Sequence, residues 1–121
     1  MAAATILVVD DDPAVLQLTS CILTGSGYEV ARAANAEQAL EIVKSPPPRD
    51  LVLSDSVMPG MQGPELLEEV RRVSPATALI LMSGYTAHSE LPPGASFLAK
   101  PFAEADLLRT VEEVLTAYRR P

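Results

Sequence analysis

The sequence predicts an α/β domain built on a parallel sheet with helices on both faces. Three observations support this prediction. Five short apolar segments, each of the length of a buried strand, alternate with segments whose apolar residues recur at helical spacing. Glycine, proline or a capping Asp or Asn marks most boundaries between them. Because alternating strands and helices form doubly wound parallel sheets, the pattern predicts that architecture for the whole chain.

Length and composition limit the classes of protein to which the chain can belong. Its 121 residues predict a single domain spanning residues 1–121, and no segment is apolar enough to cross a membrane. The net charge of −7 argues against nucleic-acid binding, which needs a basic surface. The apolar start lacks the basic region of a signal peptide, and the single cysteine, Cys21, falls in a helical apolar pattern. We therefore expect a cytoplasmic protein with a buried, reduced thiol.

The first half of the chain predicts two strands and two helices. An apolar run at 5–9 ends in three aspartates and Pro13, which suits the first turn of a helix with Asp12 as its N-cap. The residues of this helix expected to face the core are Val15, Leu18, Ile22 and Leu23. A more polar strand at 28–33, nearer to a sheet edge, precedes a helix that Asn35 caps and that ends before a run of three prolines.

The second half predicts three strands, each followed by a polar residue, and two helices. These strands are 51–53 before Asp55, 78–82 before Ser83, and 96–99 before Lys100. One helix begins at about residue 64, and the other covers about 103–119. The inward residues of the earlier helix are expected to be Leu66, Leu67, Val70 and Val73. With right-handed crossovers, the five strands predict the flavodoxin-like order 2-1-3-4-5.

Polar residues follow the C-terminal ends of four predicted strands. They are Asp10, Asp11, Asp55, Ser83 and Lys100. Because these ends meet at one edge of a parallel sheet, where open α/β folds bind ligands, we expect the side chains to share a crevice. Clustered carboxylates repel each other, and a small number of oxygen ligands favours Mg²⁺. Each residue alone has another interpretation: Asp55 as a helix cap, Ser83 as a turn former and Lys100 as a solvated lysine.

This set of groups suits phosphoryl transfer. A carboxylate, here Asp55, can attack phosphorus and form an aspartyl phosphate. Such a reaction depends mainly on positioning and charge neutralisation, which Mg²⁺ and Lys100 would supply. The hydroxyl of Ser83 could then bond a phosphoryl oxygen and report that the group is present.

The chain resembles the receiver domains of two-component response regulators across essentially its whole length. The resemblance is carried by residues 6–13 (ILVVDDDP), 50–63 (DLVLSDSVMPGMQG) and 97–102 (FLAKPF). It implies that Asp55 accepts phosphate from a kinase phosphohistidine, and that Mg²⁺ is held by Asp10, Asp11, Asp55 and the backbone carbonyl of Val57. It also implies that Lys100 contacts the phosphoryl group, that Ser83 and Phe97 are the switch residues, and that the Lys100–Pro101 bond is cis.

The resemblance also implies partners. The motifs are most similar to receivers of hybrid sensor histidine kinases, so the expected partner in the phosphorelay is a histidine kinase or a histidine phosphotransfer domain. We expect either a free-standing receiver or, preferably, a piece of a larger signalling protein. Such a receiver is a phosphoacceptor rather than an enzyme, catalysing only its own phosphorylation and dephosphorylation.

The chain departs from the family between Ser83 and Lys100, where it is several residues shorter. This predicts a shortened or missing fourth helix, with at most one helical turn in residues 87–95 and a loop for the rest. Because that helix contributes to the family's dimerising face, we expect a monomer or weak dimer.

A phosphohydrolase is the rival interpretation. Asp10 and Asp12 at the end of a first strand resemble the nucleophile and acid–base pair of haloacid-dehalogenase-like enzymes. Pro13 replaces that family's glycine-rich turn, the late acidic motif is missing, and Asp55 would have no role. A third interpretation, a degenerate receiver that only binds partners, conflicts with the intact acidic set.

Overall fold

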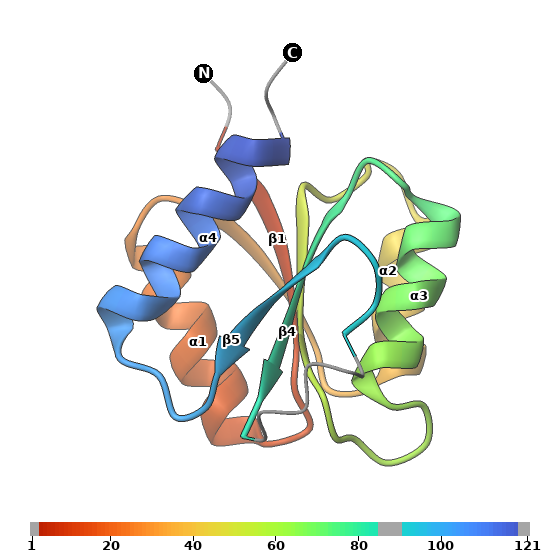
Figure 1. The fold of residues 1–121 in the computed structure, drawn as a ribbon, viewed down its shortest axis with the longest axis horizontal. Helices are drawn as coiled ribbons and strands as arrows, with labels where there is room; N and C mark the ends of the chain where they lie inside the picture. The colour runs from red at the N-terminus through yellow and green to blue at the C-terminus, as the bar shows by residue number, and fades with distance from the viewer. Residues whose placement is uncertain (1–2, 85–90, 119–121) are drawn as a thin grey trace.

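Five parallel strands form one sheet in the order β2-β1-β3-β4-β5 in the computed structural model, which describes residues 3–84 and 91–118 (Figure 1). The predicted fold and strand order are confirmed. No helix in these two ranges is long and apolar enough to cross a membrane. The elements along the described chain are β1 (Thr5–Val9), α1 (Pro13–Gly25), β2 (Glu29–Ala33), α2 (Ala36–Lys44), β3 (Leu51–Asp55), α3 (Gly63–Val73), β4 (Ala78–Ser83), β5 (Ala95–Ala99) and α4 (Glu104–Tyr118).

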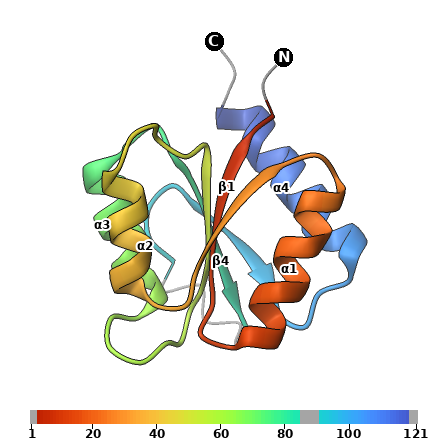
Figure 2. The same cartoon turned by 180° about the vertical axis from the view of Figure 1, so that it is seen from behind.

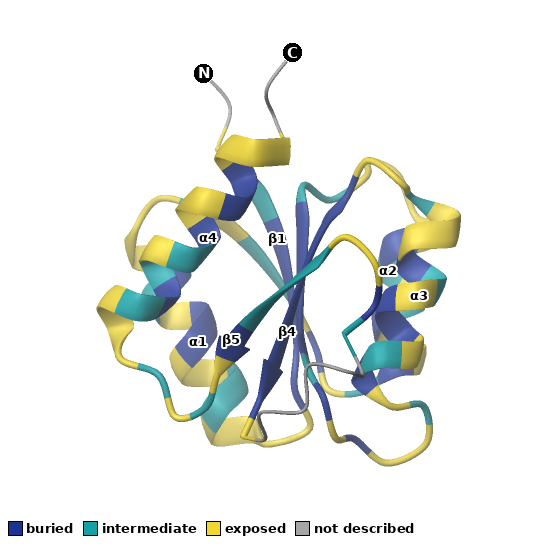
Figure 3. Ribbon diagram, in the orientation of Figure 1, coloured by how far each residue is buried: buried dark blue, intermediate teal, exposed yellow. Residues whose placement is uncertain are grey.

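The helices cover the sheet as two layers, with α1 and α4 on one face and α2 and α3 on the other (Figures 1 and 2). Alternate residues of β1 point to the two layers: Ile6 and Val8 pack under α1 and α4, whereas Leu7 and Val9 pack under α2 and α3. The central strands β3 and β4 are buried from end to end apart from Asp55, which is half-buried (Figure 3). This core places the carboxyl end of every strand at one edge of the molecule.

Both predicted helix caps are confirmed. The Asp12 carboxylate accepts a hydrogen bond from the Ala14 amide at 2.9 Å, and Asn35 Oδ1 accepts one from the Gln38 amide at 2.8 Å. Each cap satisfies a backbone donor that the helix itself leaves unpaired, which stabilises a helix start by about 1 kcal/mol. The side chain of Asp12 is therefore engaged by α1.

Three predictions of burial are wrong. Leu18 is 60% exposed and Cys21 is exposed, because the buried stripe of α1 contains Thr19, Ser20 and Leu23. At 3.6 residues per turn, positions 18 and 21 lie on the opposite side of the helix from that stripe. Val73 is on the inward side of α3 but 38% exposed, since it is the last residue of the helix, where less neighbouring structure covers it.

The link between β4 and β5 agrees with a shortened or missing fourth helix. The described parts of the chain contain four helices, and residues 91–94 form none of them. Leu91 packs against the core beneath α2 and α3, and the amide of Ala95 donates to the Pro92 carbonyl at 3.0 Å. Residues 85–90, which include His88 and most of the predicted helical turn, lie outside the described residues.

Candidate functional site

The carboxyl end of β1 delivers a buried carboxylate, Asp10. It is 0% exposed, its Oδ1 accepts from the Asp12 amide at 2.9 Å, and its Oδ2 accepts from Lys100 Nζ at 2.9 Å. Asp11, one residue later, is exposed. The first strand therefore contributes one carboxylate held inside the site and one at its rim.

The carboxyl end of β3 delivers Asp55, whose side chain is 13% exposed. Its Oδ1 accepts from the Ser56 amide at 2.9 Å and from Lys100 Nζ at 3.1 Å. The neighbouring backbone stays in the sheet, because the Ser56 amide donates to the Met82 carbonyl at 2.9 Å. Asp55 caps no helix: α3 begins eight residues later and has Gln62 at its N-cap position.

The lysine that follows β5 joins the two strand ends. Lys100 Nζ contacts both Asp10 and Asp55, and its side chain is 22% exposed, which excludes the interpretation as a solvated lysine. The backbone amide of Lys100 donates to the Ser83 carbonyl at 2.8 Å, which continues the pairing of β5 with β4. The Lys100–Pro101 bond is cis, as expected.

The charges influence one another strongly in this half-buried place. Burial raises the pKa of Asp55, and the Asp10 carboxylate raises it further, while the hydrogen bond from Lys100 opposes part of the rise. Burial by itself would lower the pKa of Lys100, but its hydrogen bonds to Asp10 and Asp55 outweigh burial and hold that pKa above its ordinary value. The Lys100 ammonium therefore stays charged, and this single positive charge is shared between the carboxylates of Asp10 and Asp55.

The donor set fits a hard divalent cation. Within the described ranges, Asp10, Asp11 and Asp55 each present a carboxylate oxygen, and these oxygens lie within 4.8 Å of one another. Three anionic oxygens with one open, exposed side match the preference of Mg²⁺ for a few carboxylates and several waters. Thiol or imidazole ligands are absent from this group, so softer metals are not favoured.

The remaining predicted residues surround this cluster. Ser83 ends β4 and is 7% exposed, and Phe97 lies half-buried in β5, opposite Leu81 of β4. Val57 is 58% exposed in the connection between β3 and α3. The sequence interpretation missed Gly63, which packs directly on the backbone of Asp55. The sequence shows a glycine at the end of this turn, but it does not show that this glycine contacts the backbone of Asp55.

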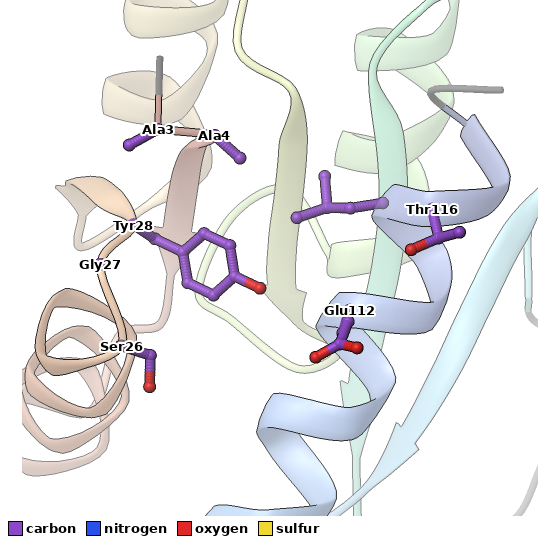
Figure 4. Close-up of a pocket in the computed structure, with 8 residues that line it drawn as sticks. Ala3, Ala4, Ser26, Gly27, Tyr28, Glu112 and Thr116 are labelled. Carbon is purple, nitrogen blue, oxygen red and sulfur yellow. The ribbon is translucent and has the colours of Figure 1, made fainter. Parts of the chain in front are cut away.

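A pocket at the opposite edge of the sheet is distinct from this cluster (Figure 4). It lies between the turn before β2 and helix α4, with Tyr28 and Glu112 among its lining residues. Burial raises the pKa of Tyr28, and the Glu112 carboxylate adds to the rise. None of the three clustered aspartates lines this pocket, so we assign the chemistry to the carboxyl edge.

Comparison with known proteins identifies the family. The family model described as the response regulator receiver domain matches residues 6–112. The chain belongs to this family. A receiver is a phosphoacceptor domain of two-component signalling, which is therefore the role of this domain, and the comparisons give no support to the phosphohydrolase alternative.

Similar proteins come from several kinds of signalling system. The sensor kinase CckA of Brucella abortus is 41% identical over 119 residues, which are 93% of this chain and 13% of that protein. The transcriptional regulatory protein ZraR of Klebsiella oxytoca is 40% identical over 119 residues, 94% of this chain and 27% of that protein. The chain thus spans a minor part of these relatives.

Solved structures confirm the fold. A receiver domain protein (CheY-like) from Methanospirillum hungatei has a TM-score of 0.89 at 35% identity, with 97% of each chain covered. The chemotaxis protein CheY4 of Vibrio cholerae has a TM-score of 0.84 at 32% identity, with 93% of this chain and 99% of that chain covered.

Proposed function

We propose that Asp55 is the phosphoacceptor of this receiver domain. The observation that carries the proposal is the position of Lys100 Nζ, 2.9 Å from Asp10 and 3.1 Å from Asp55, beside a cluster of three carboxylates. Asp10 is fully buried and engaged by Lys100 and a backbone amide, whereas Asp55 keeps part of its carboxylate accessible. Asp12 is tied to the start of α1, so it is not available as an acid–base partner.

In the proposed reaction, a carboxylate oxygen of Asp55 attacks the phosphorus of a phosphohistidine. A P–O bond forms, the P–N bond breaks, and the imidazole nitrogen leaves with the electron pair and takes a proton. Lys100 stabilises the charge that develops on the phosphoryl oxygens. Asp10, Asp11, Asp55 and the carbonyl of Val57 would hold Mg²⁺, which when bound supplies further neutralisation of phosphoryl charge.

We propose that Ser83 and Phe97 transmit the modification. Ser83 lies at the end of the strand next to β3, and its carbonyl is linked to the Lys100 amide. A hydroxyl there can bond a phosphoryl oxygen, and a shift of β4 would reach Phe97 on the paired strand β5. The half-buried position of Phe97 allows it to change between packed and exposed arrangements.

The wider setting is also a proposal. We propose a single receiver domain over residues 1–121, a cytoplasmic location, and a histidine kinase or histidine phosphotransfer domain as the phosphoryl donor. The similarity to the sensor kinase CckA supports a place in a hybrid kinase, although the transcriptional regulators are similar as well. Catalysis would be limited to the domain's own phosphorylation and dephosphorylation. The net charge of −7 supports a domain that does not itself bind nucleic acid, and we propose a monomer or weak dimer.

Phosphorylation by a small donor tests the acceptor. With acetyl phosphate and Mg²⁺, the wild type should gain one phosphate by intact mass, and Asp55→Asn should gain none. Asp12→Asn is the matched control, because the Asp12 carboxylate accepts from two amides at the start of α1, while the backbone amide that donates to Asp10 is kept in the variant. This variant should still be phosphorylated. Loss of labelling in Asp12→Asn with retention in Asp55→Asn would instead support the phosphohydrolase arrangement.

A further inference from the structure

Gly63, the first residue of α3, lies against the main chain of the proposed phosphoacceptor. Its amide donates to the Ser56 carbonyl at 3.0 Å. A Cβ at this position would overlap the carbonyl oxygen of Asp55 and lie only 2.7 Å from Ser56 Cα. These are backbone atoms at the end of a central strand, so they cannot rotate away as the tip of a side chain can. Only glycine allows the two segments to approach so closely.

Both sides of this contact are fixed. On the strand side, the Ser54 hydroxyl donates to the Asp55 carbonyl at 2.9 Å, and the Ser56 amide pairs with Met82 in β4. On the helix side, the Gln62 side chain accepts from the Met58 amide at 3.3 Å, and Met58 is 2% exposed. A hydrogen bond thus joins Met58 and Gln62 across the connection between β3 and α3, and the buried Met58 anchors this connection in the core. A displacement at Gly63 has to be taken up by α3, by Asp55, or by both.

We infer that Gly63 is a positioning residue for the acceptor, holding the end of β3 where the Asp55 carboxylate meets Asp10, Asp11 and Lys100. This inference rests on the proposed function of Asp55. The tolerance is small, because Mg²⁺ demands oxygens at about 2.0–2.1 Å in near-octahedral geometry. A displacement of about 1 Å can slow a positioned reaction about 100-fold. The Val57 carbonyl belongs to the same connection and would move with it.

The test compares Gly63→Ala with Gly25→Ala. Each glycine is a terminal residue of a helix, Gly63 the first of α3 and Gly25 the last of α1, but a Cβ at Gly25 has no atom within 4 Å. Gly25→Ala therefore controls for the substitution itself. Two quantities are measured on folded protein: the Mg²⁺ dissociation constant by calorimetry, without any phosphodonor, and the rate of phosphorylation by acetyl phosphate at saturating Mg²⁺. If Gly63→Ala is partly unfolded, all proteins are measured in trimethylamine N-oxide, which favours the compact state.

For Gly63→Ala we expect weaker Mg²⁺ binding and slower phosphorylation, each by about 10–100-fold, as for other losses of support around a metal site. Gly25→Ala should change neither by more than about twofold. A lower melting temperature with unchanged Mg²⁺ affinity and rate in the folded protein would show a merely structural role and overturn the inference.

Measurements on the wild type separate a failure of the proposed function of Asp55 from a failure of the inference about Gly63. If the wild type binds Mg²⁺ but gains no phosphate on Asp55, the proposed acceptor is wrong, and the Mg²⁺ affinities of the two glycine variants alone decide the role of Gly63. If the wild type neither binds Mg²⁺ nor gains phosphate, both the function and the inference are overturned.

Discussion

Replacing Lys100 by methionine tests whether its ammonium holds the carboxylate cluster together. Nζ lies 2.9 Å from Asp10 Oδ2 and 3.1 Å from Asp55 Oδ1, and at an effective dielectric constant near 20 each contact gives about 5–6 kcal/mol of Coulomb attraction. Desolvation of the ions offsets much of this, and removing one partner of a buried pair costs about 3–5 kcal/mol. Because the side chain of Lys100 is 22% exposed, we expect the lower end, about 3 kcal/mol, in the presence of a chelator.

Thermal and urea unfolding of Lys100→Met measure this loss. For a domain of this size, 3 kcal/mol corresponds to a melting temperature lower by about 8–15 °C. Mg²⁺ should then stabilise the variant more than it stabilises the wild type, because the ammonium no longer competes for the oxygens of Asp10 and Asp55. Phosphorylation by acetyl phosphate should nevertheless be strongly reduced, since the charge of Lys100 is missing from the transition state.

The exposed lysine at the end of α2 provides the control. Lys44→Met should change stability by no more than about 0.5 kcal/mol and leave the response to Mg²⁺ unchanged. Equal melting temperatures of Lys100→Met and the wild type in chelator would refute the reasoning. So would a smaller Mg²⁺ stabilisation of Lys100→Met, because both results would show that Lys100 neutralises nothing in the apo site.

Two further perturbations test the electrostatics. At 100 times its dissociation constant, Mg²⁺ should stabilise the wild type by about 2.7 kcal/mol. Asp11→Asn should be stabilised less by Mg²⁺ than the wild type and should be more stable than the wild type in chelator. A wild-type melting temperature that does not respond to Mg²⁺ would contradict the proposed metal site. Because the pKa of Tyr28 is raised, its contribution to stability is complete below about pH 10 and is lost as pH rises through the folded value. Glu112→Gln should reduce this loss and Tyr28→Phe abolish it in urea titrations, whereas equal losses in all three proteins would contradict the assignment.

Local patterns in the sequence were sufficient to predict the fold and the gathering of Asp10, Asp11, Asp55 and Lys100 at one edge of the sheet. Five apolar runs separated by helical segments identify a parallel sheet, since buried strands and amphipathic helices have different periods. The topology then brings Asp10, Asp55 and Lys100 to one edge, because parallel strands all end on the same side. Capping by Asp12 and Asn35 was equally predictable, since a cap depends on residues within one turn.

Contacts between distant segments were decided by the tertiary structure. Leu18 and Cys21 are apolar residues on a helix, but only the position of α1 on the sheet determines which side of it is buried. Lys100 bridges two carboxylates, Asp10 and Asp55, that precede it by 90 and 45 residues in the chain. That it does so rather than facing solvent depends on the register of β5 against β4. Gly63 shows the same limit. The sequence indicates a turn, whereas the close approach to Asp55 arises only when α3 packs on the sheet, because steric exclusion acts between atoms in space and not along the chain.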